Sequence, residues 1–228
     1  VERDKSGTQL YSSQIIPNRG AWIEYETDSN EILSVRVDRT RKQPLTTLLR
    51  ALGMGSDEEI LRTFGPDTRL MKTLEKDTTT DYESGLKEIY KKLRPGEPPT
   101  FDSAKSLLNS LFYDAKRYDL AHVGRYKYNK KLGISNRLVD VIAAEDVIDP
   151  NTGEIMVEAG DTISRSLGKT IENAGVDSVL VYGKSRGTVD ENIETKVIGN
   201  RFVEIALYVK EEALPAKMAK QVYYPVLR

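Results

Sequence analysis

The first part of the chain alternates between apolar and polar positions, which is the pattern of β-strands that bury one face. The alternation predicts strands over residues 10–16, 21–26 and 32–38. Proline and glycine at residues 17–20 favour a turn between the first two. Pairing the apolar faces of the second and third strands in a hairpin fixes their register. That register places Trp22 near Arg36 on the opposite, polar face.

Helical spacing replaces this alternation in the next part of the chain. Leucines recur three and four residues apart after Pro44, a residue that suits the first helical position. Ser56 and Glu59 form a capping-box pattern, and Thr100 is a good N-cap. The predicted helices cover residues 44–52, 56–64, 82–93 and about 100–112. A mixed domain of β-hairpins and about four helices follows from these elements.

The pattern changes again after about residue 138. Turn clusters rich in Gly, Asn and Asp recur, and short β-branched stretches such as residues 178–182 lie between them, with one helix over residues 164–174. The sequence therefore predicts an α+β protein with a mixed domain at 1–137 and a small β-rich module at 138–228. Residues 200–228 fit either that module or a return into the first domain.

Composition limits the class of protein. The 228 residues are 39% hydrophobic and 30% charged, with mean hydropathy -0.48, which is typical of a water-soluble globular chain and not of a fibre or a disordered tail. No apolar run approaches the roughly 18 residues of a membrane helix. Cysteine is absent, which removes thiol nucleophiles and cysteine-ligated metals and fits a reducing cytoplasm, and His122 is the single histidine. Since the chain starts on Val1, we expect a piece of a longer protein.

Net charge is unevenly distributed along the chain. Residues 1–137 contain 24 Lys and Arg against 20 Asp and Glu, whereas residues 138–228 contain 10 against 15. The overall net charge of -1 thus hides a mildly basic half and an acidic half. Only the first half is suited to face a polyanion such as nucleic acid.

Trp22 and the charged residues around it are the strongest candidates for chemistry. An indole on the polar face of a strand is either covered by a neighbouring element or free to stack on an unpaired base. The basic residues near it are either a solvated strand end or contacts to phosphates. Asp38 either balances their charge or accepts from a base edge. The basic residues are Arg19, Arg36, Arg39, Arg41 and Lys42.

Other patterns are weaker. Residues 149–154 resemble a calcium loop but lack its ligand ladder, so we interpret them as a hairpin turn. Residues 45–64 could form a helix-turn-helix, but its second helix is too acidic for a DNA groove. Lys217 loosely matches a lipoyl attachment lysine, and His122 is assigned a structural role. The sequence contains no P-loop and no paired-aspartate magnesium motif.

Five blocks in the first 130 residues resemble, in the same order, the β subunit of bacterial RNA polymerase. They are IIPNRGAWIEYE at 15–26, VRVDRTRK at 35–42, LLRALG at 48–53, LRPGEPPT at 93–100 and RYDLAHVGRYKYN at 117–129. The resemblance implies that the chain is an internal fragment covering the lobe, one wall of the DNA cleft. The second module is similar to small inserts of the sandwich-barrel-hybrid type.

The resemblance also implies roles for single residues. Trp22 matches a tryptophan that stacks on an unpaired base of the non-template strand, and Asp38 matches a residue of a pocket for a non-template guanine. Arg36, Arg39 and Arg41 match basic residues that face the cleft, although Thr40 stands where some relatives have a further basic residue. Implied partners are downstream DNA, the non-template strand, and the β′, α and σ subunits.

The family is a nucleotidyltransferase whose catalytic Mg²⁺ is held by aspartates of β′. The fragment is therefore expected to hold no cofactor and no catalytic residue of its own, and to work in the cytoplasm at the nucleoid. Two alternatives stay open. The acidic second module could dock transcription factors and make the chain chiefly an assembly module, or the chain could be a free-standing DNA-binding protein.

Overall fold

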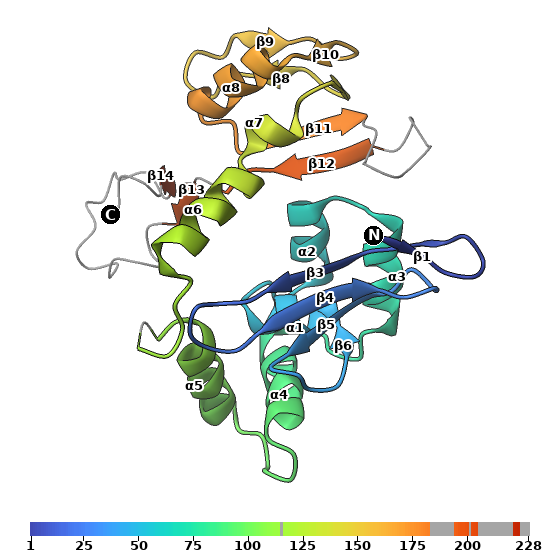
Figure 1. Ribbon diagram of the computed structural model, residues 1–228, viewed down its shortest axis with the longest axis vertical. Helices are drawn as coiled ribbons and strands as arrows, with labels where there is room; N and C mark the ends of the chain where they lie inside the picture. The colour runs from blue at the N-terminus through green and yellow to red at the C-terminus, as the bar shows by residue number, and fades with distance from the viewer. Residues whose placement is uncertain (115, 183–193, 201, 205–220, 224–228) are drawn as a thin grey trace. The chain divides into compact units, whose positions relative to one another are not determined.

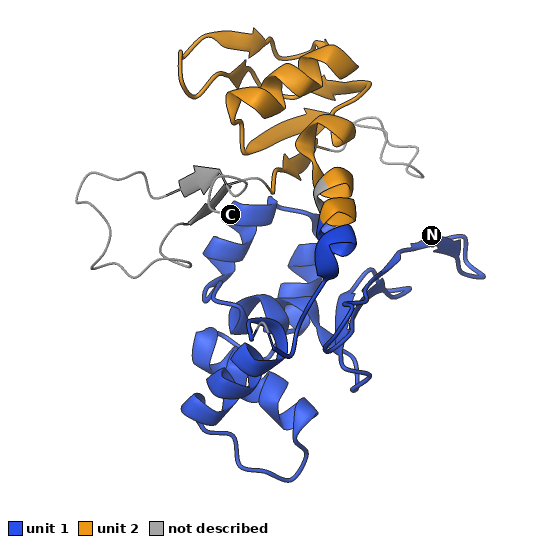
Figure 2. Cartoon of the chain, turned by 60° about the vertical axis from the view of Figure 1, so that its left-hand side comes forward, with its two compact units in different colours: residues 1–125 blue, residues 126–228 orange. Residues whose placement is uncertain are grey.

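The computed structural model describes residues 1–114, 116–182, 194–200, 202–204 and 221–223 (Figure 1). Its chain forms two compact units, residues 1–125 and residues 126–228 (Figure 2). The units divide within helix α6 (Ala121–Leu132), whereas the sequence suggested a boundary after residue 137. Lys217, the possible attachment lysine, lies outside the described residues, as does most of the segment 200–228.

The strands of the first unit form an antiparallel sheet of four, in the order β3-β4-β5-β6, and a small β1-β2 hairpin. The strands are β1 (Glu2–Arg3), β2 (Gln9–Leu10), β3 (Ser12–Ile15), β4 (Ile23–Thr27), β5 (Leu33–Val37) and β6 (Gln43–Pro44). The predicted hairpin is confirmed in β4 and β5, where Ile23 pairs with Val37 and Tyr25 with Val35. The single strand expected over residues 10–16 is split between β2 and β3.

Helices follow the sheet in the first unit. They are α1 (Leu45–Ala51), α2 (Asp57–Phe64), α3 (Thr68–Lys76), α4 (Tyr82–Leu93) and α5 (Phe101–Phe112). The predictions of α1, α2, α4 and α5 are confirmed, but Pro44, expected at the first helical position, is the N-cap residue before α1. Helix α3 was not predicted, and it contributes only Leu70 and Thr73 to the buried set. Its N-cap, Asp67, which accepts the N–H groups of Arg69 and Leu70, was the available signal.

Packing of α1 on β5 and of α4 on α1 and α5 builds the core of this unit (Figure 1). Val35 and Val37 of β5 are fully buried against Leu48 of α1 and Leu86 of α4. Helices α1 and α4 approach closely at Gly85, where an added Cβ would lie 2.8 Å from Cβ of Arg50. The apolar faces that the sequence assigned to β4, β5 and α4 are therefore the faces that the core uses.

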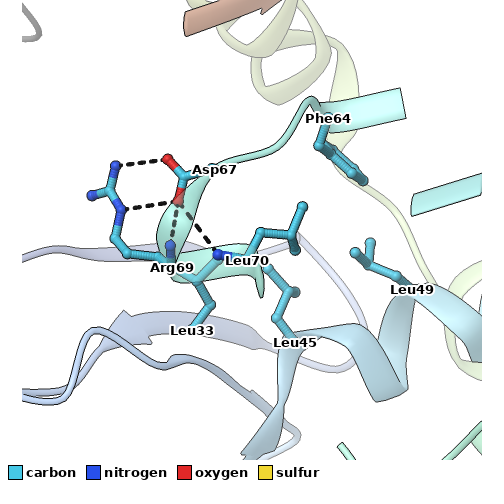
Figure 3. A pocket seen from close by; sticks show the side chains of 7 residues that line it. All are labelled: Leu33, Leu45, Leu49, Phe64, Asp67, Arg69 and Leu70. Carbon is cyan, nitrogen blue, oxygen red and sulfur yellow. Dashed lines mark hydrogen bonds and ion pairs between the residues drawn. The ribbon is translucent and has the colours of Figure 1, made fainter. Parts of the chain in front are cut away.

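A pocket of about 180 Å³ lies between β5, α1, α2 and α3 (Figure 3). Five of the residues that line it are apolar: Leu33, Leu45, Leu49, Phe64 and Leu70. The other two are Asp67 and Arg69 at the start of α3. No sequence pattern indicated this pocket, because its lining comes from four separate elements.

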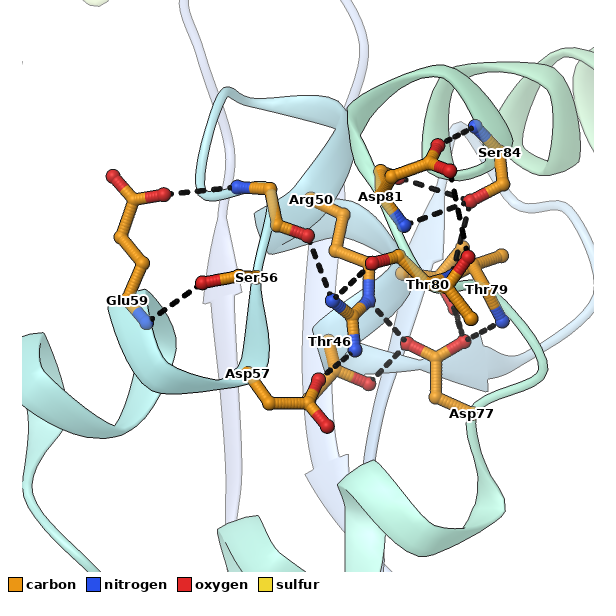
Figure 4. A network of polar contacts seen from close by, with 12 residues as sticks. Thr46, Arg50, Ser56, Asp57, Glu59, Asp77, Thr79, Thr80, Asp81 and Ser84 are labelled. Atoms are coloured by element: carbon orange, nitrogen blue, oxygen red, sulfur yellow. Dashed lines mark hydrogen bonds and ion pairs between the residues drawn. The ribbon is translucent and has the colours of Figure 1, made fainter.

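A buried guanidinium connects the helices of the first unit (Figure 4). The Arg50 side chain is 2% exposed, and it donates to the carbonyl oxygens of Gly55 at 2.8 Å and Thr80 at 3.2 Å. It also forms ion pairs with Asp57, which is 54% exposed, and with the 1% exposed Asp77, whose Oδ2 lies 3.6 Å from its Nε. A charge buried this deeply is tolerated only with such partners.

Threonine hydroxyls complete the hydrogen bonding of Asp77. Thr46 donates to its Oδ2 at 2.5 Å and Thr47 to its Oδ1 at 3.0 Å, both from α1. Thr79 donates through its backbone N–H at 2.9 Å and its hydroxyl at 2.7 Å. The carboxylate thus ties the segment after α3 to α1.

The second unit is rich in short strands, as the sequence predicted for the later part of the chain. Its strands are β7 (Val141–Ala143), β8 (Val147–Ile148), β9 (Ile155–Val157), β10 (Thr162–Ile163), β11 (Ser178–Tyr182), β12 (Glu194–Ile198), β13 (Phe202–Glu204) and β14 (Gln221–Tyr223), with helices α7 (Ile134–Arg137) and α8 (Arg165–Ala174). One sheet has the order β10-β7-β11-β12, and β8-β9 and β13-β14 each form a two-stranded antiparallel sheet. Among the described strands none closes into a barrel.

Local predictions within the second unit are confirmed in several places. Strand β11 and helix α8 occupy the predicted ranges, and residues 149–154 form the hairpin turn between β8 and β9, with the Asp149 N–H donating to the Glu154 carbonyl at 2.9 Å. Helices α6 and α7 were not predicted. With its helices and small antiparallel sheets, the chain is an α+β protein, as expected.

Asp77→Ala is expected to lower the free energy of unfolding by about 3–5 kcal/mol, because it leaves the Arg50 guanidinium without its buried counter-ion. Asp57→Ala is the matched control, since it removes a carboxylate that pairs with the same guanidinium but is largely exposed, and it should cost about 1 kcal/mol or less. Urea unfolding of both variants measures the difference. Equal losses of unfolding free energy in the two variants would show that the burial of Asp77 does not determine its contribution to stability.

Candidate nucleic-acid interface

A left-handed turn ends strand β5. Asp38 and Arg39 have φ angles of 51° and 61°, and the Thr40 N–H donates to the Val37 carbonyl across them at 3.1 Å. Positive φ at both central residues is the feature of a type I′ turn. In an extended strand, residue 39 would point to the opposite face from residue 38. Because of the turn, the direction of the Arg39 side chain does not follow the alternation of the strand.

Trp22 is covered in part by the arginine of this turn. The Arg39 Cζ lies 5.2 Å from the centroid of the indole ring, within the range of a cation–π contact. The turn is also fixed to the tryptophan by the backbone, since the Asp38 N–H donates to the Trp22 carbonyl at 2.8 Å. Trp22 itself is partly buried and lies just before β4. The structure therefore pairs the indole with Arg39, and not with the expected Arg36.

Arg36 has a different partner. It lies opposite Glu24 in the β4–β5 register, and its Nη2 is 3.5 Å from Oε1 of Glu26. Lys42 forms an ion pair with the same oxygen. Glu24 in turn accepts a hydrogen bond from Gln14 of β3 at 2.8 Å. The Glu26 carboxylate thus offsets two of the predicted cations, and it was not among the residues that the sequence assigned to the site.

Three other arginines have no carboxylate of this kind to neutralise their charge among the described residues. Arg19, Arg39 and Arg41 are exposed, and within the described part of the chain none has an ion pair with a carboxylate. Asp38 is exposed as well and likewise has no ion pair among the described residues. The site therefore presents cations and one carboxylate at the end of β5, with an aromatic ring among them.

Backbone contacts hold the turn before Trp22. The Arg19 N–H donates to the Asp119 carbonyl at 3.1 Å, and the Asp119 N–H returns a bond to the Arg19 carbonyl at 2.8 Å. Gly20 has φ 125°, and a Cβ there would lie 2.9 Å from the Arg117 carbonyl and 2.7 Å from the Tyr118 ring. Arg19 is thus placed by residues about a hundred positions later, which the sequence pattern did not indicate.

Other candidates contribute no second site. His122 is exposed on α6. Across the residues that the structure describes, no three His, Asp and Glu side chains gather in a way that could hold a metal ion. No described helix is long and apolar enough to cross a membrane.

Comparison with known proteins shows which family the chain belongs to. Residues 1–148 match the family described as RNA polymerase Rpb2, domain 2. The chain is 58% identical over 225 residues to the DNA-directed RNA polymerase subunit beta of Alkaliphilus metalliredigens, covering 99% of this chain and 18% of the relative. It is 56% identical over 227 residues to the subunit of the same name from Clostridioides difficile, covering 100% of this chain and 18% of that relative.

These matches define a domain of a large RNA polymerase subunit, and the chain belongs to the family of bacterial RNA polymerase β subunits. The resemblance inferred from the five sequence blocks is thereby confirmed. The chain spans about 18% of the length of the relatives it matches. The match to the family continues past residue 125 into the second compact unit.

Gly20→Ala is expected to destabilise the first unit more than Gly96→Ala does. Both glycines have positive φ, which costs an alanine about 1–3 kcal/mol. Only at Gly20 does the new Cβ also meet backbone and ring atoms, and that overpacking adds about 1–3 kcal/mol. Thermal unfolding of the two variants tests this, and equal losses would contradict the packing of Gly20 on residues 117 and 118.

Proposed function

We propose that the first unit forms the lobe wall of the DNA cleft in RNA polymerase and holds downstream DNA and the non-template strand during transcription. The contact between the Arg39 guanidinium and the partly buried Trp22 ring carries this proposal. Aromatic rings and arginine planes are the surfaces on which unpaired bases stack. An intact duplex hides the faces of its bases, so such a surface suits a strand that is held open.

The arrangement of charges supports phosphate contacts at the same place. Arg19, Arg39 and Arg41 are exposed without carboxylate partners among the described residues, so they are available to phosphates. Arg36 and Lys42 share Glu26 and are expected to contribute less. Phosphate contacts of this kind position DNA without reading its sequence.

Asp38 is the residue we propose for base recognition. Its carboxylate is exposed next to the Arg39–Trp22 pair. An ionised carboxylate has no hydrogen to donate, so it acts only as a hydrogen-bond acceptor. Base amino groups, such as those of guanine and cytosine, are donors that suit it. A base stacked near Trp22 would therefore be read at Asp38.

The polymerase reaction itself belongs, in this proposal, to the assembled enzyme. We propose that the chain works as a piece of a DNA-directed RNA polymerase, a nucleotidyltransferase, with β′, α and σ as partner subunits, at the nucleoid in the cytoplasm. The catalytic Mg²⁺ would be held by β′, and this chain would supply no catalytic residue.

A second function, docking of transcription factors on the second unit, has one observation in its favour. Ile148 and Ile155 are register partners on the β8–β9 hairpin and are 53% and 55% exposed, and Ile142 on β7 is 41% exposed. Exposed apolar side chains on an otherwise acidic module are suited to a protein partner. We place this function second, because single exposed isoleucines are common on protein surfaces.

Trp22→Ala is expected to shorten the lifetime of open promoter complexes formed by reassembled polymerase. Loss of one stacked base costs about 1–3 kcal/mol, which is roughly a five-fold or larger change. The decay of preformed complexes after challenge with a competitor gives the lifetime. Tyr126→Ala, which removes a 65% exposed aromatic side chain of the second unit, is the control and should leave the lifetime unchanged.

Two outcomes of that experiment would count against the proposal. Failure of the Trp22→Ala chain to unfold cooperatively would assign Trp22 to the core. Normal assembly with an unchanged lifetime would remove the stacking role and favour docking of factors on the second unit.

Replacing Arg39 is expected to weaken DNA binding regardless of sequence and to flatten its salt dependence. The slope of log K against log salt should fall by about 0.7–0.9 for each phosphate that the protein no longer neutralises. Asparagine tolerates the left-handed backbone of residue 39 at least as well as arginine does, so Arg39→Asn removes the charge without damage to the turn and serves as a second variant beside Arg39→Ala.

Binding of reassembled polymerase to bubble-containing DNA of several sequences, over a range of salt, measures both variants. Arg36→Ala is the control, with a smaller effect because Glu26 already offsets Arg36. A loss that depended strongly on sequence, or an Arg36 effect as large as that of Arg39, would contradict the assignment.

A further inference from the structure

The pocket between β5, α1, α2 and α3 is independent of the candidate nucleic-acid interface (Figure 3). Its apolar lining comes from Leu33, Leu45, Leu49, Phe64 and Leu70, while the interface uses residues 19, 22 and 36–42. At about 180 Å³ it is slightly larger than the roughly 150 Å³ apolar cavity, lined by leucine and similar side chains, that is known to bind benzene. Its size therefore matches a small aromatic molecule with one ring or two fused rings.

The two charged residues of the pocket neutralise one another. The Arg69 Nε and Nη2 donate to the two oxygens of Asp67 at 3.3 and 3.1 Å, and Oδ1 of Asp67 also accepts the N–H groups of Arg69 and Leu70. Burial by itself would raise the pKa of Asp67, but these hydrogen bonds and the guanidinium charge outweigh it and lower the pKa. Arg69 also lies 5.3 Å from the ring of Tyr11.

The ion pair between Asp67 and Arg69 limits the charge that a ligand of this pocket can carry. A charged molecule entering the pocket would lose its hydration and find each pocket charge already occupied by the other. A neutral ring loses little on leaving water and gains contact with four leucines and the ring of Phe64. Phe64 is 37% exposed at the end of α2, so a ligand can reach the lining without unfolding the core.

We propose that this pocket is a binding site for a small, neutral, single-ring or fused bicyclic aromatic molecule. The ligand lies against Leu45, Leu49 and Phe64, with its polar substituent toward the Asp67–Arg69 pair. The same chemistry occurs in an aromatic side chain of a protein partner, and the choice of probes separates the two.

The test uses 5-fluoroindole as probe, with its fluorine resonance followed as the 228-residue chain is added. We expect saturable binding, and no binding of 4-fluorobenzoate, because Asp67 already occupies the one cation that lines the pocket. Leu49→Phe should fill the pocket and abolish binding. Leu52→Phe is the matched control, because Leu52 is at the end of the same helix, is 43% exposed and does not line the pocket.

A second variant keeps the test decisive if Leu49→Phe does not fold. Phe64→Ala removes the most accessible part of the lining and should weaken 5-fluoroindole binding at least five-fold. Absence of saturable binding to the parent chain, or unchanged affinity in every folded pocket variant, would overturn the proposal. Binding of N-acetyl-tryptophanamide ten-fold tighter than 5-fluoroindole would also overturn it, because the extra affinity would come from a peptide backbone and identify a protein side chain as the occupant.

Discussion

The buried ion pair between Arg50 and Asp77 is the interaction on which the first unit depends. Side chains that are 2% and 1% exposed keep their charges in a protein interior only when a counter-ion and hydrogen-bond partners compensate the loss of water. The partners of Arg50 lie before α2 and before α4, and those of Asp77 lie in α1 and just after α3. Moving any of these segments away would leave a buried charge unsatisfied, so the pair holds the helices as one block.

That helical block also determines where the sheet can pack. Helix α1 covers the inner face of β5, where Val35 and Val37 are fully buried, and this burial fixes the register of β5 with β4. The fixed register brings Asp38 opposite Trp22, at the point where β5 ends in the left-handed turn. The aromatic and charged groups of the candidate interface are therefore positioned by a core to which they contribute nothing.

Local pairing decides which cations of the interface are available. Glu26 lies between Arg36 and Lys42 and offsets both, whereas Arg39 is turned onto the indole and Arg41 stays exposed. A count of basic residues would rank all of these equally. In the proposed role Arg19, Arg39 and Arg41 attract the backbone of DNA, and the Trp22–Arg39 pair stacks on a base. Arg39 therefore takes part in both contacts, and Asp38 is the residue assigned to base recognition.

Local signals in the sequence were enough to predict the hairpin of β4 and β5, five of the described helices, two of them with their N-caps, the α+β class and the family. Periodicity, capping residues and long sequence blocks each need only neighbouring residues. The roles of Trp22, Asp38 and the basic residues were predicted from the same sequence and stay predictions. The contact of Arg39 with Trp22 became visible in the folded chain alone, since alternation assumes an extended backbone and a left-handed turn breaks it. The same holds for Arg50, a charge that sequence patterns assign to the surface. It lies in the core because its counter-ion Asp77 comes from a segment that only folding brings near.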